Sequence, residues 1–249
     1  MGIILKSRRE IEMMRDAGKI VAEILQVLRY KVKSGMKTKE LDEITMTEIK
    51  KHKAQSSFLG YRGFPASICV SVNDEIVHGI PGEREIKSGD IVSLDVGAIY
   101  KGYQGDAAIS IGIDKISPKA RELLEVTENA LKAGISAAKH NSRLGDIGWA
   151  IQHYAESRGF SVVREYTGHG IGRSMHEDPL VPNIGHPGEG IPIQKGMVFA
   201  LEPMVNVGGW QTRVAANKWT VLTKDGSLSA HFEHTIAITD DEAQVLTAI

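Results

Sequence analysis

The chain has 249 residues, of which 42% are hydrophobic and 24% are charged, and its formal net charge is −1 at pH 7. This composition is ordinary for a globular protein and supplies no excess positive charge for nucleic acid or an anionic membrane surface. No apolar run approaches the length of a membrane span. The single cysteine, Cys69, excludes an internal disulfide framework and indicates a reducing compartment. We therefore expect a cytoplasmic protein without membrane association or recognition of nucleic-acid sequence.

The first half of the sequence predicts two helices followed by strands. Residues 8–31 carry apolar side chains at helical spacing, and Gly35 ends this segment. Thr38 is suited to cap a second helix, whose inward face continues to Ile49. Short apolar runs then predict buried strands at 67–72, 91–96 and 107–111.

The same order of elements returns in the second half. Ser117 and Pro118 suit the start of a helix that extends to about His140, and a further helix ends at Gly159. Strand-like segments follow at 160–164, 198–201, 219–222 and 232–239. This repetition predicts one α+β domain over residues 1–249, in which two similar halves form a curved, mainly antiparallel sheet covered by helices. Because the halves are alike in pattern and not in identity, a chance likeness is the alternative.

Four carboxylates lie within or beside apolar runs that predict buried strands: Asp95, Asp106, Glu202 and Glu233. Burying a carboxylate is costly unless it is paired, hydrogen-bonded or bound to a cation. His169, in a glycine-rich segment, adds one imidazole. A single dinuclear metal site would account for all five side chains. Oxygen-rich sites with one imidazole suit Mn(II), Fe(II) or Co(II), with zinc as a further candidate, and paired cations that share a water indicate a hydrolase.

Short segments across essentially the whole chain resemble type I methionine aminopeptidases of metallopeptidase family M24: 73–81, 94–97, 105–106, 167–172, 175–177, 201–204 and 231–235. The resemblance implies the pita-bread fold, which has the two-half symmetry predicted above. It implies an enzyme that removes the N-terminal methionine from nascent proteins and peptides and prefers a small second residue. The implied reaction is hydrolysis by a hydroxide that bridges two metal ions.

The resemblance also implies the roles of individual residues. The implied metal ligands are Asp95, Asp106, His169, Glu202 and Glu233, of which Asp106 and Glu233 would bridge both ions. Glu202 would in addition transfer a proton to the leaving amine. His78 and His176 would contact the substrate amide and the developing oxyanion. Around the methionine side chain the resemblance places Tyr61, Phe64, Cys69, Met175 and Trp219.

Cofactors and partners follow from the same resemblance. The implied divalent ions are cobalt, manganese, iron(II), zinc or nickel, and Asn73 and Ser229 match positions that bind a monovalent cation in the family. The partners would be nascent polypeptide N-termini, met by a monomeric enzyme. The basic segment 50–53 is most simply a solvated helix end, with transient docking on the ribosome as the alternative reading.

Other roles for these residues and other functions for the chain are the alternatives. Taken alone, Cys69 is a packed core residue, and Phe64 and Trp219 are ordinary packing aromatics. Relatives that cleave X-Pro bonds share the fold but usually carry an additional N-terminal domain, whereas this chain starts almost directly at the catalytic half. A binding protein that kept the fold and lost its chemistry would lack metal ligands, and here all five positions are filled.

Overall fold

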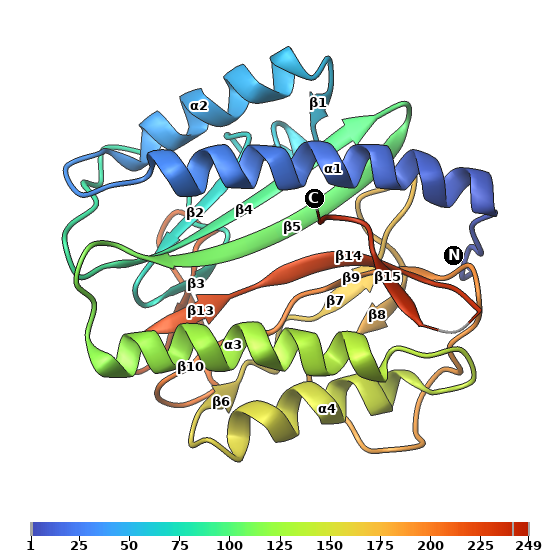
Figure 1. The fold of residues 1–249 in the computed structure, drawn as a ribbon. Helices are drawn as coiled ribbons and strands as arrows, with labels where there is room; N and C mark the ends of the chain where they lie inside the picture. The colour runs from blue at the N-terminus through green and yellow to red at the C-terminus, as the bar shows by residue number, and fades with distance from the viewer. Residues whose placement is uncertain (1, 241, 249) are drawn as a thin grey trace.

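A computed structural model describes residues 2–240 and 242–248 of the chain. Its helices in the described part are α1 Arg8–Lys31, α2 Thr38–Lys51, the 3-10 turn η1 Tyr61–Gly63, α3 Pro118–Ala137 and α4 Leu144–Glu156. Helices α1 and α2 lie along the first half of a curved sheet, and α3 and α4 lie along the second half (Figure 1). No helix within the described ranges has the length and apolarity needed to cross a membrane.

Local sequence signals explain where the two long helices begin. The Ser7 hydroxyl accepts a hydrogen bond from the Glu10 amide at 3.4 Å, and the Glu10 carboxylate accepts one from the Ser7 amide at 2.9 Å. This reciprocal capping box satisfies backbone donors that a helix N-terminus leaves unpaired. Ser117 caps α3 with one such bond, its hydroxyl accepting from the Ala120 amide at 3.1 Å, and Pro118 lies in the first turn as predicted.

The start of α2 corrects one prediction. Thr38 is the first helical residue and Lys37 is the N-cap, so the expected Thr38 cap is wrong by one position. The Glu40 carboxylate accepts from the Lys37 amide at 2.6 Å, which fixes the start of the helix there. The Thr38 hydroxyl instead links the start of α2 to Gly82, whose amide donates to it at 2.8 Å.

The main sheet has nine strands among the described residues, in the order β1-β4-β5-β14-β9-β7-β8, with β2 paired to β4 and β15 to β14. All of its pairs are antiparallel. The strands are β1 Gln55–Ser56, β2 Cys69–Val72, β4 Ile91–Tyr100, β5 Tyr103–Gly112, β7 Gly168–Gly170, β8 Glu177–Val181, β9 Val198–Leu201, β14 Glu233–Ile238 and β15 Ala243–Val245. The α+β prediction of a curved antiparallel sheet covered by helices is confirmed.

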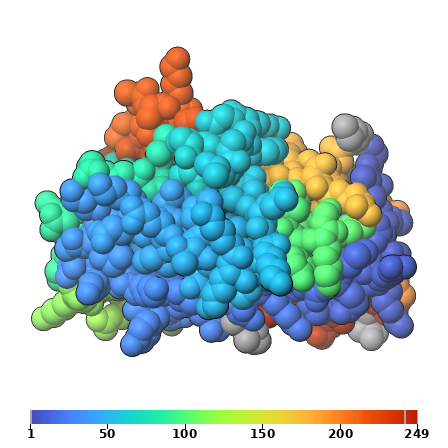
Figure 2. Space-filling model, turned by 90° about the horizontal axis from the view of Figure 1, so that it is seen from above, coloured from blue at the N-terminus to red at the C-terminus, as the bar shows by residue number. Residues whose placement is uncertain are grey.

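Two small sheets in the described part complete the architecture, one in the order β13-β10-β6 and one in the order β11-β12-β3. Their strands are β3 Glu75–Val77, β6 Ser161–Val162, β10 Met204–Asn206, β11 Thr212–Val214, β12 Val221–Thr223 and β13 Ser229–His231. The strand predicted at 160–164 is observed only at Ser161–Val162, and the strand predicted at 219–222 begins at Val221. The orange-red hairpin of β11 and β12 projects from the surface seen from above (Figure 2).

The two halves join where β5 pairs with β14, with Glu233 opposite Ala108 and His234 opposite Ala107. Each half has its own apolar core beneath its helices. Ile24, Leu41 and Leu94 belong to the first core, and the second includes Leu123 and Phe199. The helices of each half therefore pack through an apolar core onto the sheet, which gives side chains near the junction a rigid support.

Candidate active site

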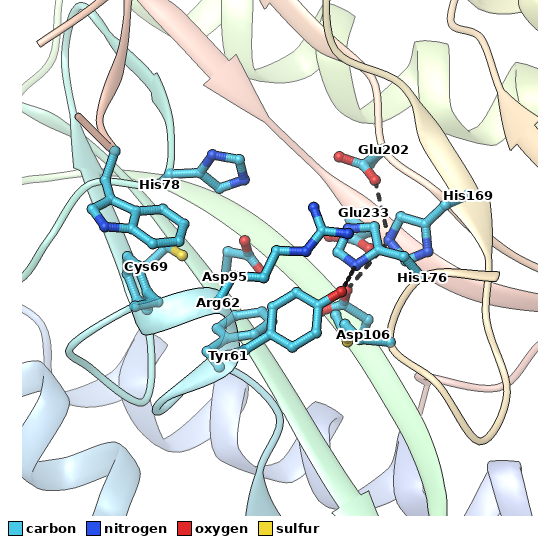
Figure 3. A pocket seen from close by; sticks show the side chains of 14 residues that line it. Tyr61, Arg62, Cys69, His78, Asp95, Asp106, His169, His176, Glu202 and Glu233 are labelled. Atoms are coloured by element: carbon cyan, nitrogen blue, oxygen red, sulfur yellow. Dashed lines mark hydrogen bonds and ion pairs between the residues drawn. The ribbon is translucent and has the colours of Figure 1, made fainter.

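The five predicted metal ligands line one cavity near the junction of the halves. Asp95 lies in β4, Asp106 in β5, His169 in β7, Glu233 begins β14, and Glu202 follows β9. In Figure 3 the carboxylates of Asp95, Asp106 and Glu233 lie between His78 on one side and His169 on the other. Antiparallel pairing brings these residues together although they are widely separated in sequence.

The donor atoms fit a divalent metal site. One ligand atom each from Asp106, His169 and Glu233 lie within 4.8 Å of one another. The Oδ1 atoms of Asp95 and Asp106 and the Oε1 atom of Glu233 are buried without a hydrogen-bond partner among the described residues. Unpaired buried carboxylate oxygens are strongly unfavourable, and a coordinated cation supplies the missing partner. Hard oxygen donors with one imidazole suit a first-row divalent ion.

The electrostatics of the cluster follow from burial. Burial raises the pKa of Asp95 to about 7. Burial, followed by the neighbouring carboxylates, raises the pKa values of Asp106 and Glu233 well above their usual range, and Glu202 is raised in the same direction. Like charges in a poorly solvated site cannot all ionise unless positive charge is added. Cation binding therefore replaces protons at this cluster.

His169 is oriented as a ligand. Its Nδ1 lies 2.9 Å from the carbonyl oxygen of Gly170, so we place the proton on Nδ1 as the donor. The Nε2 lone pair then faces the acids, 3.6 Å from Glu202 Oε1 and 3.9 Å from Asp106 Oδ2. Burial lowers the pKa of His169 to about 3, which keeps the ring neutral and able to donate that lone pair.

His176 and His78 stand beside the cluster and line the same cavity. The His176 ring centroid is 4.1 Å from that of His169, and its Nδ1 lies 2.9 Å from the Tyr61 hydroxyl oxygen. Burial lowers the pKa of His78 to about 4. The His78 backbone has φ of 59°, in the left-handed region, and its ring meets the Tyr166 ring edge-on with centroids 6.1 Å apart. Strain of this kind is common where a side chain must point into a site.

The residues predicted to surround a methionine side chain line the same cavity, of about 150 Å³: Tyr61, Phe64, Cys69, Met175 and Trp219. Phe64 and Trp219 meet edge to face with ring centroids 5.2 Å apart, a favourable arrangement of aromatic quadrupoles. Burial raises the pKa of the Cys69 thiol well above its usual range, so the thiol stays protonated and acts as a small apolar wall. The cavity thus joins an acidic end to an apolar end.

Three further residues at this site were not predicted from the sequence: Phe58, Arg62 and His231. Phe58 and Arg62 also line the cavity, and the Arg62 guanidinium lies 5.4 Å from the Tyr61 ring centroid. His231 is 2% exposed, and its Nε2 lies 3.8 Å from Glu233 Oε2 without a hydrogen-bond partner among the described residues. Strand alternation could have found His231, because residues 231 and 233 share one side of an extended chain.

Asn73 and Ser229, the residues matched to a monovalent cation site, are neighbours in the structure. The Ser229 amide donates to the Asn73 carbonyl oxygen at 2.9 Å. The Asn73 side chain is occupied elsewhere, since its oxygen accepts from the Ile91 amide at 3.0 Å and its nitrogen donates to Asp90 at 2.8 Å. Cation binding at these two residues stays a prediction.

Comparisons with known proteins agree with this geometry. The family model of metallopeptidase family M24 matches residues 12–240. The methionine aminopeptidase of Clostridium perfringens is 50% identical over 247 residues, 99% of each chain, and methionine aminopeptidase 1 of Bacillus subtilis is 51% identical over 99% of this chain and 100% of its own.

Solved structures of similar proteins have the same fold. The crystal structure of methionine aminopeptidase from Thermotoga maritima superposes with a TM-score of 0.98 at 44% identity, covering 100% of both chains. Prolidase from Pyrococcus furiosus has a TM-score of 0.81 at 22% identity over 99% of this chain and 66% of its own, which shows a shared fold. The pita-bread fold is therefore confirmed. At such identities over its whole length, and with an acidic cluster built to hold metal, this chain belongs to metallopeptidase family M24.

Proposed function

We propose that this protein is a metal-dependent aminopeptidase that removes the N-terminal methionine from nascent proteins and peptides by hydrolysis, with a preference for a small second residue. The observation that carries the proposal is the two-sided cavity, in which a buried carboxylate cluster adjoins an apolar pocket of aromatic and sulfur side chains. Relatives that are 50% and 51% identical are named methionine aminopeptidases.

The acidic end of the cavity would hold two divalent cations. Asp106 and Glu233 would bridge them, Asp95 would bind one, and His169 and Glu202 would complete the other. When bound, such ions supply Lewis acidity and lower the pKa of a coordinated water towards neutrality. The donor set admits cobalt, manganese, iron(II), zinc or nickel, and their availability decides which is used.

The protein's own groups would handle the proton and the developing charge. With the Tyr61 hydroxyl donating to Nδ1, the proton of His176 is on Nε2, where it can donate to the carbonyl oxygen as that atom becomes an oxyanion. The Glu202 carboxylate lines the same cavity and would take a proton from the attacking water and deliver it to the leaving amine. Neutral His78 would contact the substrate amide from the opposite side.

Specificity would come from the apolar end. An unbranched thioether is polarizable, and contacts between sulfur and aromatic rings contribute about 0.3–1.5 kcal/mol each. Phe64 and Trp219 offer aromatic rings for such contacts within the cavity, and Met175 adds a flexible apolar side chain. The acidic end would hold the free α-amino group at a fixed distance from this pocket, which restricts cleavage to the first peptide bond.

We assign the function to a single catalytic domain over residues 1–249. Asp95 and Asp106 come from the first half, whereas His169, Glu202 and Glu233 come from the second. Because neither half contains the whole ligand set, the two must fold together to form the site. The proposed setting is the cytoplasm, where a monomer meets nascent N-termini, with transient contact to the ribosome and a monovalent cation held near Asn73 and Ser229.

Release of free methionine from Met-Gly-Met-Met tests the function. Metal-stripped protein would be assayed alone and after separate addition of Mn(II), Fe(II) or Co(II), with an Ala-Pro peptide as the rival substrate. We expect methionine release only with added metal. Cleavage of the proline peptide alone would assign the protein to the proline-specific relatives, and no cleavage with any metal would favour a binding protein.

A further inference from the structure

Lys6 and Glu177 form a buried ion pair between segments that are far apart in the sequence. Lys6 Nζ lies 2.5 Å from Glu177 Oε2, and the two side chains are only 4% and 8% exposed. Lysine and glutamate are rarely buried to this extent unless they are paired. Neither residue lines the cavity of the candidate active site. The pair therefore needs an explanation beyond direct contact with substrate.

The Glu177 carboxylate organises the loop that precedes it. While Oε2 accepts from Lys6, Oε1 accepts from the Ser174 amide at 3.1 Å. Gly172 closes the loop, with its carbonyl oxygen accepting from the Gln104 amide at 2.8 Å and its amide donating to the Ser174 carbonyl oxygen at 3.2 Å. Residues 172–177, the His176 loop, are thus folded around one buried carboxylate.

The fit around the ion pair is tight. A Cβ atom on Gly172 would lie 2.6 Å from Glu177 Oε1 and 2.6 Å from Lys6 Cε, so a larger residue there would displace the two partners from their observed positions. Lys6 itself is held at its backbone, where its amide donates to the Gly196 carbonyl oxygen at 2.7 Å. Its ammonium also donates to the Ile4 carbonyl oxygen at 3.0 Å. The N-terminal segment therefore presents the ammonium in a fixed position.

The residues next to Glu177 are the ones that the reaction uses. Met175 and His176 line the cavity, whereas Glu177 turns away from it to meet Lys6. We propose that Lys6 is a positioning residue, whose ammonium anchors Glu177 and so holds His176 towards the substrate carbonyl. This inference rests on the proposed aminopeptidase function. A catalytic donor displaced by about 1 Å loses much of its effect, so the anchor would act on turnover.

Lys6→Met tests the proposal, because methionine keeps an unbranched apolar chain and removes the charge. Loss of a whole oxyanion donor lowers kcat by about 10²–10³, and a misplaced donor should lose part of that, roughly 10-fold. We expect this loss in kcat, with KM changed by less than about 3-fold and Mn(II) affinity in isothermal titration calorimetry unchanged. The matched control is Lys195→Met, which removes the exposed ion pair with Asp240 beside Gly196 and should leave kcat unchanged.

A second set of variants separates positioning from general weakening of the structure. If Lys6 acts through His176, adding Lys6→Met to His176→Ala should cause no further loss of kcat. An additional 10-fold loss in that background would overturn the proposal, as would wild-type kcat in Lys6→Met alone. Should Lys6→Met fail to fold, Lys6→Met/Glu177→Gln removes both buried charges. A wild-type kcat in this double variant would equally overturn it.

Hydrogen–deuterium exchange supplies a readout that does not depend on turnover. The Ser174 amide donates to the carboxylate that Lys6 anchors, so peptides covering the His176 loop should exchange faster in Lys6→Met and normally in Lys195→Met. Unchanged exchange in this loop would contradict the anchor. If wild-type protein released no methionine with any metal, the proposed function would fail while the exchange result still reported on the ion pair.

Discussion

At the scale of single residues, the site depends on hydrogen bonds that hold the two histidine rings in place. His169 is fixed by the Gly170 carbonyl oxygen, and His176 is fixed by the Tyr61 hydroxyl, at 2.9 Å in both cases. The Tyr61 and His176 rings also stack, with centroids 5.5 Å apart and planes 11° apart. Tyr61 is therefore more than the pocket wall that the sequence suggested, because its hydroxyl and its ring hold the His176 imidazole beside the cavity.

Tyr61→Phe separates these two uses of one side chain. The variant keeps the aromatic wall and removes the hydroxyl, so we expect KM for a methionyl peptide to be unchanged. A neutral hydrogen bond contributes about 0.5–1.5 kcal/mol, which corresponds to a fall in kcat of about 2- to 13-fold. Steady-state kinetics of both constants would test this. Phe64→Leu, which thins the wall without touching His176, should instead raise KM, and a Tyr61→Phe variant with raised KM and wild-type kcat would contradict the assignment.

Asp106 carries two of the observations that indicate a metal site. It belongs to the group of three ligand atoms within 4.8 Å, and its Oδ1 is buried without a partner among the described residues. Asp106→Ala should abolish Mn(II) binding in calorimetry and methionine release, while the helical circular dichroism signal stays close to wild type. Asp240→Ala, at an exposed ion pair, is the control. Full activity in Asp106→Ala would exclude the bridging role.

At the scale of elements, close packing of α1 on β5 sets the position of Asp106. A Cβ atom on Gly105 would lie 2.8 Å from the Ala17 carbonyl carbon and 2.8 Å from the Gly18 amide nitrogen, both of which are backbone atoms of α1. Helix backbone cannot yield as a flexible side chain does. The glycine next to the ligand thus lets the helix and the strand approach closely.

Gly105→Ala should push α1 away from β5 and lower the free energy of unfolding by about 1–3 kcal/mol, the usual cost of overpacking. Urea unfolding of the metal-free protein measures this without interference from bound ions. Gly82→Ala is the matched control, because a Cβ atom there would meet nothing within 4 Å. Equal stabilities of the two variants would show that the helix and strand separate without cost.

Secondary structure was predictable where the sequence pattern was long. Helices at 8–31 and from Pro118 follow from their apolar spacing and caps, and the strand at Val198–Leu201 was predicted at its observed bounds. The strands missed have only two to five residues, and β7, Gly168–Gly170, contains two glycines. Such strands exist because of their neighbours, so local propensity cannot find them.

At the scale of the whole molecule, the acidic cluster links stability to pH and to metal. In the metal-free protein, burial raises the pKa of Asp95 to about 7 and raises Asp106, Glu202 and Glu233 further above their usual range. Unfolded carboxyl groups titrate near 4, so the folded state holds more protons above that pH and becomes less stable as pH rises. The buried histidines His78, His169 and His231, with pKa values lowered to about 3 to 4, act oppositely, and their effect fades above about pH 7.5, where unfolded histidines have lost their protons.

We therefore expect the Tm of chelator-treated protein to fall between about pH 7.5 and pH 8.5, where the raised carboxyl groups still hold protons and unfolded histidines no longer do. Saturating Mn(II) should reverse this trend, because deprotonation of the ligands favours metal binding as pH rises and binding to the folded state stabilises it. Scanning calorimetry with and without Mn(II) over this range measures both effects. A metal-free Tm that stays constant or rises would show that the carboxyl groups do not hold protons in the folded state.

The sequence by itself determined the residue types, the order of the long elements and the family. Four carboxylates in apolar runs already predicted a metal site, because burial of unpaired charge is too costly to leave unexplained. The tertiary structure decided what depends on contacts between distant segments. Lys6 lies 171 positions from Glu177, and Tyr61 lies 115 positions from His176. Neither pairing leaves a local pattern in the sequence, since such contacts form only when packing of the whole chain brings the segments together.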